Sequence, residues 1–195
     1  MKRIETGLAT ELFLNVHSRL DSSEANGPGN RSVLWAQGCS IGCDGCFNPL
    51  THNEGLADDR FSVTDLVNWV LAQSVDGLTI SGGEPFQQLA GIIELARAVR
   101  LAGLSVIVLT GYTSTQVRAL VKEQDLKECF DVVIAGPYRA SMHVAVSLRG
   151  SRNKEYLFFS DVYSEQDFKT VPEAEVLIEA DGTVIVTGIN VPTMR

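Results

Sequence analysis

The sequence predicts an α/β fold in which a parallel sheet, with helices on its outside, forms a partial (β/α) barrel. Segments that suit a strand, a loop and a helix recur along the chain, and a succession of such units implies parallel strands joined by right-handed crossovers. The chain has 195 residues, too few for the eight units of a closed barrel of about 250 residues. We therefore expect one domain, with a core over about 12–153 and a C-terminal extension over about 154–195.

The first third of the chain contains two short apolar runs that suit strands, 12–16 and 32–37. Between them, 22–30 is rich in turn-forming residues and is expected to be irregular. A helix is expected after Ser62, because Ser62 and Asp65 form a capping-box pattern and apolar residues then recur at helical spacing. The second strand leads directly into a cysteine-rich loop, at the strand end where α/β folds tend to place their chemistry.

The middle of the chain repeats a strand, a loop and a helix. We expect a strand at 78–81, a loop at 82–85 and a helix over 89–99 that Gly103 can end. The unbroken apolar run 104–109 is typical of a strand covered on both faces by helices. A helix carrying Val117, Leu120 and Val121 and strands at 131–135, 156–159, 176–180 and 183–187 complete the pattern. The last two strands are joined by Asp181-Gly182, a strong hairpin signal.

The composition argues against two classes of partner. With 16 Lys plus Arg against 24 Asp plus Glu, the chain has a formal charge of −8, which opposes attraction to nucleic-acid phosphates. No run of about 18 apolar residues is present, so no membrane-spanning helix is expected, and polar residues interrupt the basic N-terminus before a signal peptide could form. We expect a cytoplasmic protein, in which clustered cysteines are more often metal ligands or redox groups than disulfides.

Three of the four cysteines, Cys39, Cys43 and Cys46, lie in one loop with the spacing CxxxCxxC. Thiolates suit both iron-sulfur clusters and zinc. A structural zinc site needs four ligands, and His52 is the nearby candidate for the fourth. A cluster held by three cysteines leaves one iron free to chelate an amine and a carboxylate, such as the methionine end of S-adenosylmethionine. We favour the cluster over zinc and over a dithiol redox site, and interpret the distant Cys129 as incidental.

The cysteine motif, followed after the next strand by Gly-Gly-Glu-Pro at 82–85, resembles the radical S-adenosylmethionine enzymes. Within them, 43–48, 26–29 and 110–112 are similar to the small activating enzymes of glycyl-radical proteins, especially those of anaerobic ribonucleotide reductase. The segment 149–153 resembles the late Arg-Gly-Ser-Ser-Asn-Gln pattern of that group. The resemblance runs from about residue 26 to residue 153 and implies a fold of the radical S-adenosylmethionine type.

The resemblance also implies the site. The three cysteines hold a 4Fe-4S cluster, and the segment 82–84 contacts the methionine end of S-adenosylmethionine. The expected cofactor-binding residues are Phe47, Asn48, Gly82, Gly83, Glu84, Pro85, Thr110 and Tyr112. A 5′-deoxyadenosyl radical then takes a hydrogen atom from a glycine of a partner glycyl-radical enzyme, and a flavodoxin-like protein supplies electrons. Cluster and cofactor carry this chemistry, so no side chain acts as acid, base or nucleophile.

Some positions depart from the family pattern. Gly45 precedes the third cysteine where many members have an aromatic residue, Ala135 stands where the activating enzymes usually have Asp, and Arg152 and Lys154 replace Ser and Gln. A peptide or a small metabolite therefore remains an alternative target, and a zinc-binding or electron-carrier protein is the non-enzymatic alternative. The three arginines of the polar segment, Arg139, Arg149 and Arg152, could grip the cofactor carboxylate or a partner's backbone, but are expected to be solvated more often than functional.

The histidines His17, His52 and His143 are interpreted as structural, and Trp35 and Trp69 as core residues.

Overall fold

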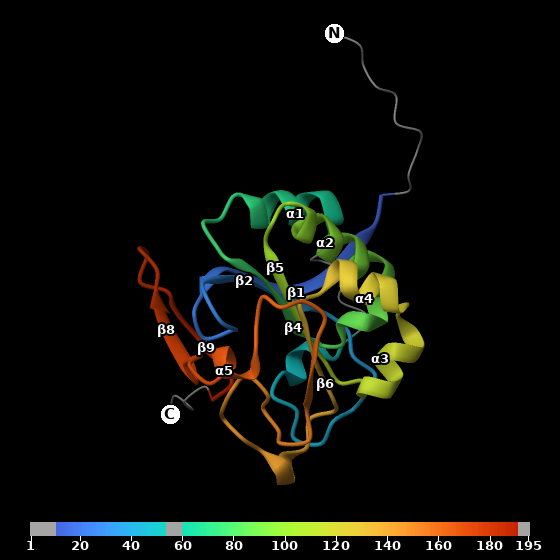
Figure 1. The fold of residues 1–195 in the computed structure, drawn as a ribbon. Coiled ribbons are helices and arrows are strands. Elements are labelled where there is room, and N and C mark those ends of the chain that lie inside the picture. Colours follow the sequence, from blue (N-terminus) through green and yellow to red (C-terminus); the bar gives the residue numbers. More distant parts are fainter. Residues whose placement is uncertain (1–10, 54–59, 191–195) are drawn as a thin grey trace, which may run out of the picture.

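Figure 1 shows the fold in a computed structural model, which describes residues 11–53 and 60–190. Its centre is a seven-stranded sheet in the order β3, β1, β2, β4, β5, β6, β7. The strands are β1 (Phe13–Ser23), β2 (Arg31–Ala36), β3 (Arg60–Ser62), β4 (Gly77–Gly82), β5 (Ser105–Thr110), β6 (Val132–Ala135) and β7 (Glu155–Phe158). The predicted α/β class is therefore confirmed.

The four central strands, β2, β4, β5 and β6, are parallel to one another, whereas β1, β3 and β7 each pair antiparallel with the strand beside them. The antiparallel pairing of β1 with β2 follows from the length of their connection. Only residues 24–30 separate β1 from β2, too few for the crossover that a parallel pair needs. Within the described part of the chain, β3 and β7 lie at opposite ends of the sheet, which is open there and not a closed barrel.

The helices of the structure are α1 (Val63–Leu71), α2 (Leu89–Leu101), α3 (Ser114–Leu120), α4 (Glu123–Cys129) and α5 (Glu165–Phe168), with 3₁₀ turns η1 (Pro49–Thr51), η2 (Pro85–Gln88) and η3 (Ala140–Met142). The predicted cap of α1 is present: the Ser62 hydroxyl accepts from Asp65 N–H at 3.0 Å and donates to the Asp65 carboxylate at 2.8 Å. None of the helices in the described ranges is long and apolar enough to cross a membrane.

Helices α1, α2 and α4 cover one face of the sheet, where most of the core lies (Figure 1). Leu34, Ile80 and Val108, from three neighbouring parallel strands, are fully buried there. A smaller cluster that includes Ile107 and Phe168 fills the other face, as expected when successive residues of a strand point to opposite sides. Cys129 is buried at the end of α4, where burial raises the pKa of its thiol to about 11. It is therefore a protonated core residue at neutral pH.

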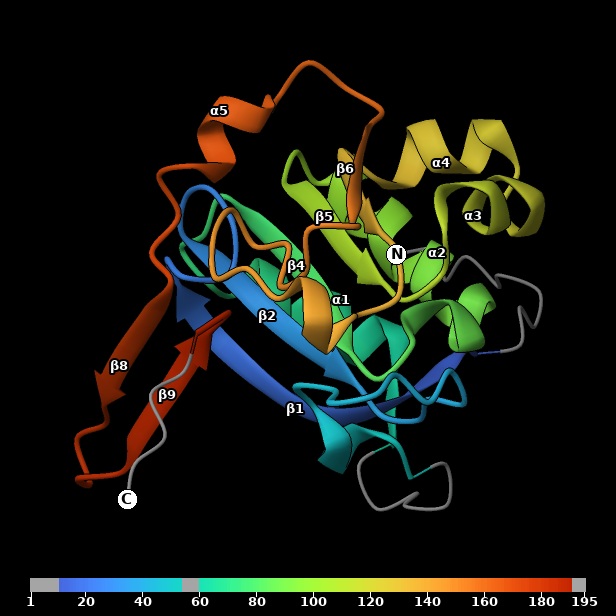
Figure 2. The same ribbon diagram turned by 90° about the horizontal axis from the view of Figure 1, so that it is seen from below.

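The C-terminal segment adds a two-stranded antiparallel sheet, β8 (Ala174–Ile178) and β9 (Val184–Gly188), beside the end of β1 (Figures 1 and 2). Three hydrogen bonds between described residues attach it to the core, one of them from Glu24 N–H to Glu175 Oε2 at 3.1 Å. The Ser23 hydroxyl donates to Glu175 Oε2 at 2.7 Å, and the Asn26 side-chain amide donates to Thr187 Oγ1 at 2.8 Å. The position of β9 relative to β1 is thus held by side chains as well as by the connecting chain.

The end of β1 and the presence of α4 differ from the expectation, each for a physical reason. The first strand was expected at 12–16, but β1 continues to Ser23 and includes residues expected to be irregular. Its polar second half is held by pairing with β2, such as Leu20 with Val33, which local sequence does not reveal. Helix α4 was not predicted at all, because its sequence, Glu123–Cys129, is mostly charged and carries one buried apolar residue, Leu126, besides Cys129.

Candidate iron-sulfur and cofactor site

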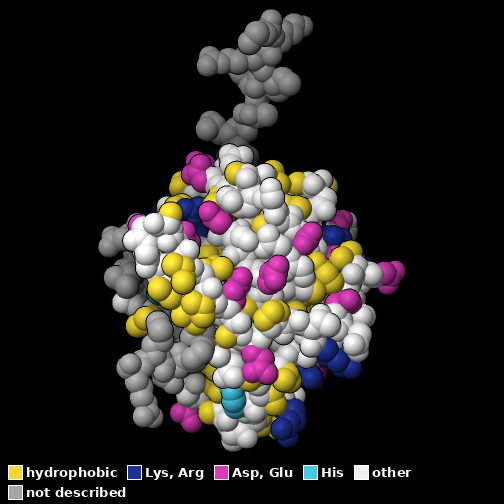
Figure 3. Space-filling view, turned by 90° about the vertical axis from the view of Figure 1, so that its left-hand side faces the viewer, with side chains coloured by type: hydrophobic (Ala, Val, Ile, Leu, Met, Phe, Trp, Pro, Cys, Tyr) yellow, Lys and Arg dark blue, Asp and Glu magenta, His cyan; other side chains and the backbone are white. Residues whose placement is uncertain are grey.

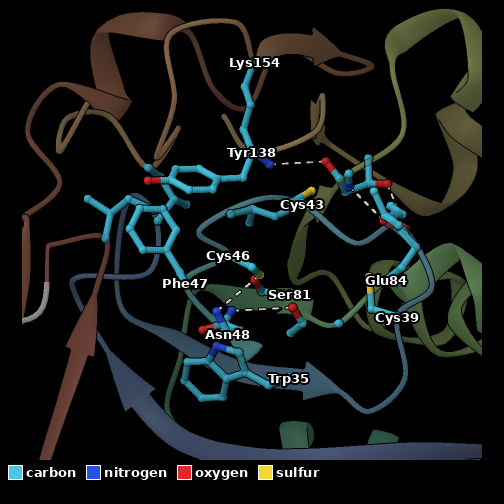
Figure 4. A pocket seen from close by; sticks show the side chains of 18 of the residues that line it. Trp35, Cys39, Cys43, Cys46, Phe47, Asn48, Ser81, Glu84, Tyr138 and Lys154 are labelled. Carbon is cyan, nitrogen blue, oxygen red and sulfur yellow. Dashed lines mark hydrogen bonds between the residues drawn. The ribbon is translucent and has the colours of Figure 1, made fainter. Parts of the chain in front are cut away.

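A cavity lies at the C-terminal ends of the parallel strands β2, β4 and β5, the edge of the sheet where the sequence places the cysteine loop. The enclosed part of this cavity has a volume of about 130 Å³, and the space counted out to the open mouth is about 950 Å³. Figure 4 shows side chains from four segments that converge on it: the cysteine loop, the loop after β4, the loop after β5, and the segment after β6. The two most specific sequence motifs therefore meet in one place.

The cysteine loop has a conformation that its glycines make available. Gly38, Gly42 and Gly45 have φ angles of 103°, 68° and 67°, in the left-handed region that L side chains disfavour. The loop is closed by backbone hydrogen bonds from Gly38 N–H to Thr51 O at 2.7 Å and from Cys39 N–H to the next carbonyl at 3.3 Å. These hydrogen bonds make residues 38–52 a compact loop, called the cysteine knot below. Its three cysteines are close to one another in sequence.

The three cysteines of this loop are free thiols of intermediate exposure, and all three line the cavity. Burial raises the pKa of the Cys39 thiol. Asn48 supports the loop: its backbone N–H donates to Cys46 Sγ at 3.4 Å, and its side-chain amide donates to Gly82 O at 3.5 Å. Among the described residues, no three Cys, His, Asp or Glu side chains are grouped closely enough to hold a single metal ion. Three thiols with an N–H directed at one sulfur are a donor set that fits an iron-sulfur cluster.

The loop after β4 is packed directly against the cysteine loop. Gly83 N–H donates to Ala36 O at 2.8 Å, and Glu84 N–H donates to Gly38 O at 2.9 Å. A Cβ atom on Gly83 would lie only 2.2 Å from Gly38 O, so the two loops approach as closely as a glycine permits. The cysteine loop and the Gly-Gly-Glu-Pro loop are therefore joined by a backbone hydrogen bond and by direct backbone packing.

Glu84 is fully buried at the base of the cavity. One carboxylate oxygen accepts from the Thr110 hydroxyl at 2.8 Å and from Phe86 N–H at 3.0 Å, and the other accepts from Gly111 N–H at 2.7 Å. Burial raises the pKa of this carboxyl, while these hydrogen bonds and the charge of Lys154 act in the opposite direction. Glu84 thus connects the loop after β4 to the loop after β5 and fixes the floor of the cavity.

The structure brings together most residues that the sequence singled out. The cavity is lined by Cys39, Cys43, Cys46, Phe47, Asn48, Gly82, Gly83, Glu84 and Thr110. Two expected residues lie elsewhere. Pro85 is buried at the start of η2 and is absent from the lining, and Tyr112 lies beside Gln116 and Leu120 in a separate surface hollow. His52 and Arg149 also line the cavity, whereas Arg139 and Arg152 are exposed.

Lys154 is the main site residue that sequence reasoning missed. Its ammonium group points into the cavity and donates to Thr110 O at 3.3 Å (Figure 4). Burial lowers the pKa of this amine, and the nearby charge of Glu84 opposes that effect. Among the described residues, no carboxylate forms an ion pair with it. The available signal was its position in the late motif, where the family pattern has Gln and this chain has a cation.

The prediction that both tryptophans pack in the core was only partly correct. Trp35 is partly exposed and lines the cavity, because it lies near the C-terminal end of β2, where the strand reaches the site. Trp69 packs against the core with part of its ring, but its indole N–H donates to Asp21 Oδ1 at 2.7 Å near the surface. An indole can be apolar on one side and polar on the other, which apolar periodicity alone does not distinguish.

An aromatic group forms one wall of the cavity. The Phe47 and Tyr138 rings lie 4.4 Å apart between centroids, and His143 approaches Phe47 at 5.5 Å. Phe47 follows the last cysteine directly, so this contact attaches the cysteine loop to the segment after β6. His143, expected to be structural, takes part in this packing.

Comparison with known proteins places this site in a family. Residues 25–157 match the family described as 4Fe-4S single cluster domain. The chain is 29% identical over 136 residues to the anaerobic ribonucleoside-triphosphate reductase-activating protein of Enterobacteria phage T4, covering 66% of this chain and 84% of that protein. The protein of the same name from Escherichia coli is 26% identical over 150 residues, covering 72% of this chain and 96% of the relative.

A further relative is the pyruvate formate-lyase-activating enzyme of Listeria monocytogenes, 34% identical over 101 residues, or 49% of this chain. The match spans only 40% of that longer enzyme. The predicted resemblance to activating enzymes of glycyl-radical proteins is confirmed by these relatives, and the predicted 4Fe-4S cofactor by the family description. Since the matched segment is more than half of the sequence and contains all three clustered cysteines, the chain belongs to the 4Fe-4S single cluster domain family.

Proposed function

We propose that this protein is a radical S-adenosylmethionine enzyme that activates a partner glycyl-radical enzyme of the anaerobic ribonucleotide reductase type. The observation that supports it best is the joining of the cysteine knot to the loop at 82–84 around one cavity. When bound, the 4Fe-4S cluster and S-adenosylmethionine supply a 5′-deoxyadenosyl radical that removes a hydrogen atom from a backbone glycine of the partner. The names of the relatives point to the same class of partner.

The residues of the chain would hold the cluster, orient S-adenosylmethionine and shield both from water. Cys39, Cys43 and Cys46 would ligate three irons, and the N–H of Asn48 directed at Cys46 Sγ stabilises negative charge on that sulfur. The backbone at 82–83 can approach a ligand closely because it carries no side chains. Phe47 and Tyr138 line the cavity, and their apolar rings would limit access of water to it. No side chain is assigned as acid, base or nucleophile.

Lys154 is assigned to the carboxylate of the methionine end. An ammonium group has three donors, and within the described part of the chain the one hydrogen bond that Lys154 Nζ makes goes to a neutral carbonyl, Thr110 O. A partly buried cation without a carboxylate partner is stabilised when an anion enters the same cavity. Glu84 accepts three hydrogen bonds from the chain, and in the described ranges it forms no direct ion pair with Lys154.

Replacing Lys154 with methionine is expected to weaken binding of S-adenosylmethionine about ten- to a hundredfold, since a hydrogen bond to a charged group contributes about 1.5–3 kcal/mol. Methionine keeps much of the side-chain volume and removes only the charge. Equilibrium dialysis of the reconstituted protein under anaerobic conditions measures this Kd without relying on turnover. The exposed Lys127 gives a matched control, because K127M removes the same charge from the surface of α4. Equal Kd values for K154M and K127M would show that Lys154 does not bind S-adenosylmethionine.

The finer features of the architecture belong to the same proposal. We assign the chain to a single radical S-adenosylmethionine domain with a core over about 12–153, in which the open sheet corresponds to a partial barrel, and a C-terminal extension over about 154–195. We place the protein in the cytoplasm, where a flavodoxin-like donor would reduce the cluster.

Anaerobic reconstitution with iron and sulfide tests the function. A brown protein with about 4 Fe per chain is expected, which cleaves S-adenosylmethionine to 5′-deoxyadenosine under dithionite. With the candidate reductase present, low-temperature EPR should then show a glycyl doublet on that partner. Cleavage of S-adenosylmethionine without that doublet would indicate that the hydrogen atom comes from a peptide or a small metabolite instead. A colourless protein that binds zinc and no cluster would contradict the proposal entirely.

A further inference from the structure

A groove runs along the surface beside the cavity, between the first strand and the C-terminal sheet. It is lined by His17–Leu20 of β1, Trp35, Phe47–Thr51 and Ile185–Gly188 of β9. It shares Trp35, Phe47, Asn48 and Gly188 with the wall of the cofactor cavity. An occupant of this groove therefore lies directly against the proposed site of radical chemistry.

Both strands present an edge to this groove. Four consecutive residues of each strand line it, whereas the face of a strand would contribute only alternate residues. Among the residues that the structure describes, β1 pairs on its outer side with β3 only over Phe13–Asn15, so that no described strand pairs with His17–Leu20 there. In the described ranges, β9 pairs only with β8. Figure 2 shows β9 beside β1 with no strand between them.

The pairing of β8 and β9 indicates which backbone groups are free. Glu179 N–H donates to Thr183 O, and Ile189 N–H donates to Glu173 O. Because residues of an antiparallel ladder alternate between bonded and non-bonded pairs, the backbone groups of Val184, Val186 and Gly188 are directed away from β8. Of these, Val186 and Gly188 line the groove and Val184 does not. An unpaired edge of this kind is a template for another strand.

The mouth of the groove also exposes apolar surface. Leu50 of η1 is 77% exposed and Phe47 is 44% exposed, although both lie next to the cysteine loop. Outside the groove lining, Val176 and Ile178 of the C-terminal sheet are exposed as well, and Figure 3, seen from that side, shows a patch of hydrophobic side chains. Free strand edge and apolar anchors together are what an extended polypeptide segment needs for binding.

We propose that this groove is the docking site for an extended, glycine-containing segment of the partner protein, which adds as a strand to the free edge of β9. The inference rests on the proposed function, because the hydrogen atom comes from a backbone glycine. An extended segment presents its backbone along its whole length, and a glycine has no Cβ to shield its α-hydrogens. The hydrogen bond from Asn26 to Thr187 holds β9 in place for this role, and the bond from Ser23 to Glu175 holds its partner strand β8.

The test measures binding of the intact candidate reductase, and of a labelled peptide containing its glycine, to the reconstituted protein. V186P removes one backbone donor directed at the groove and is expected to raise both Kd values about fivefold. V184P is the matched control, since it removes an equally directed donor outside the groove. L50S is expected to raise the Kd about tenfold, whereas L101S, which alters a leucine that is 82% exposed on α2, should leave it unchanged.

The outcomes separate this inference from the proposed function. If the unmodified protein activates the partner while V186P and L50S bind it as tightly as their controls, the docking site is wrong and the function stands. If the unmodified protein holds no cluster or does not cleave S-adenosylmethionine, the function itself fails. Sedimentation that shows a dimer of this chain dissociated by V186P would assign the β9 edge to a second copy and overturn the inference. L50S alters a side chain of η1 and leaves the pairing of β8 with β9 unchanged. Its Kd therefore tests the docking site even if a proline disturbs β9.

Discussion

Replacing any one of the three clustered cysteines with alanine is expected to abolish the cluster and the activity together. Iron content should fall from about 4 to below about 1 per chain after reconstitution, since each cysteine would hold a different iron of the cluster. Cleavage of S-adenosylmethionine should fall by more than about a thousandfold, because loss even of supporting contacts around a metal costs 10- to 100-fold. Iron analysis, the visible spectrum and the yield of 5′-deoxyadenosine measure the effect.

The physical reason lies in the position of the cysteines on a single loop. Cys39, Cys43 and Cys46 are supplied by a knot with left-handed glycines between them, and no other cysteine is close enough to substitute. His52, the earlier candidate for a fourth zinc ligand, also lines the cavity. Iron retention at the level of the unmodified protein in all three variants would show that the cysteines are not the ligands.

Cys129 provides the matched control. It is the remaining cysteine of the chain, and its thiol is buried at the end of α4 with a pKa raised to about 11. C129A is therefore expected to keep the full iron content and activity, at a cost of about 1 kcal/mol in the free energy of unfolding for the small cavity left behind. Loss of iron in C129A would mean that the effect of the other variants reflects general instability and not ligand removal.

The candidate site could be predicted to a large extent because its chemistry is local in sequence. The spacing of Cys39, Cys43 and Cys46, the glycines between them, and the loop at 82–84 are readable without any tertiary contact. The strand that precedes each motif fixes where the loops emerge, at one edge of a parallel sheet. Short apolar runs such as 104–109 identified these strands to within one or two residues.

The parts that sequence did not reveal depend on distant contacts. Lys154 reaches the cavity only because the segment after β6 folds back over the end of β5 and brings it to Thr110. Tyr112 belongs to a motif of the family, yet it turns away because α3 begins just after it. The second half of β1 is polar and is held by pairing with β2. Each of these depends on which elements become neighbours, and local propensity does not encode that.

Replacing Gly83 with alanine is expected to have the second largest effect, because this residue joins the two motifs of the site. A Cβ atom there would lie 2.2 Å from Gly38 O, 2.8 Å from Gly38 C and 3.0 Å from Thr51 O, all of them backbone atoms. Gly38 O cannot withdraw freely, since it accepts the hydrogen bond from Glu84 N–H at 2.9 Å. Relief of the contact must therefore displace the backbone directly before the first cysteine.

G83A should consequently lose about 3 kcal/mol in the free energy of unfolding and most of its iron on reconstitution, because overpacking against backbone forces a shift of the loop itself. Urea unfolding and iron analysis measure the two effects separately. The control is G103A, which places a methyl group in open space at a φ of +88° after α2. G103A should cost about 1 kcal/mol from backbone strain alone and retain full iron, since L residues disfavour the left-handed region but nothing near the site moves. A G83A protein with the stability and iron content of G103A would show that the cysteine knot and the loop after β4 are not coupled by this contact.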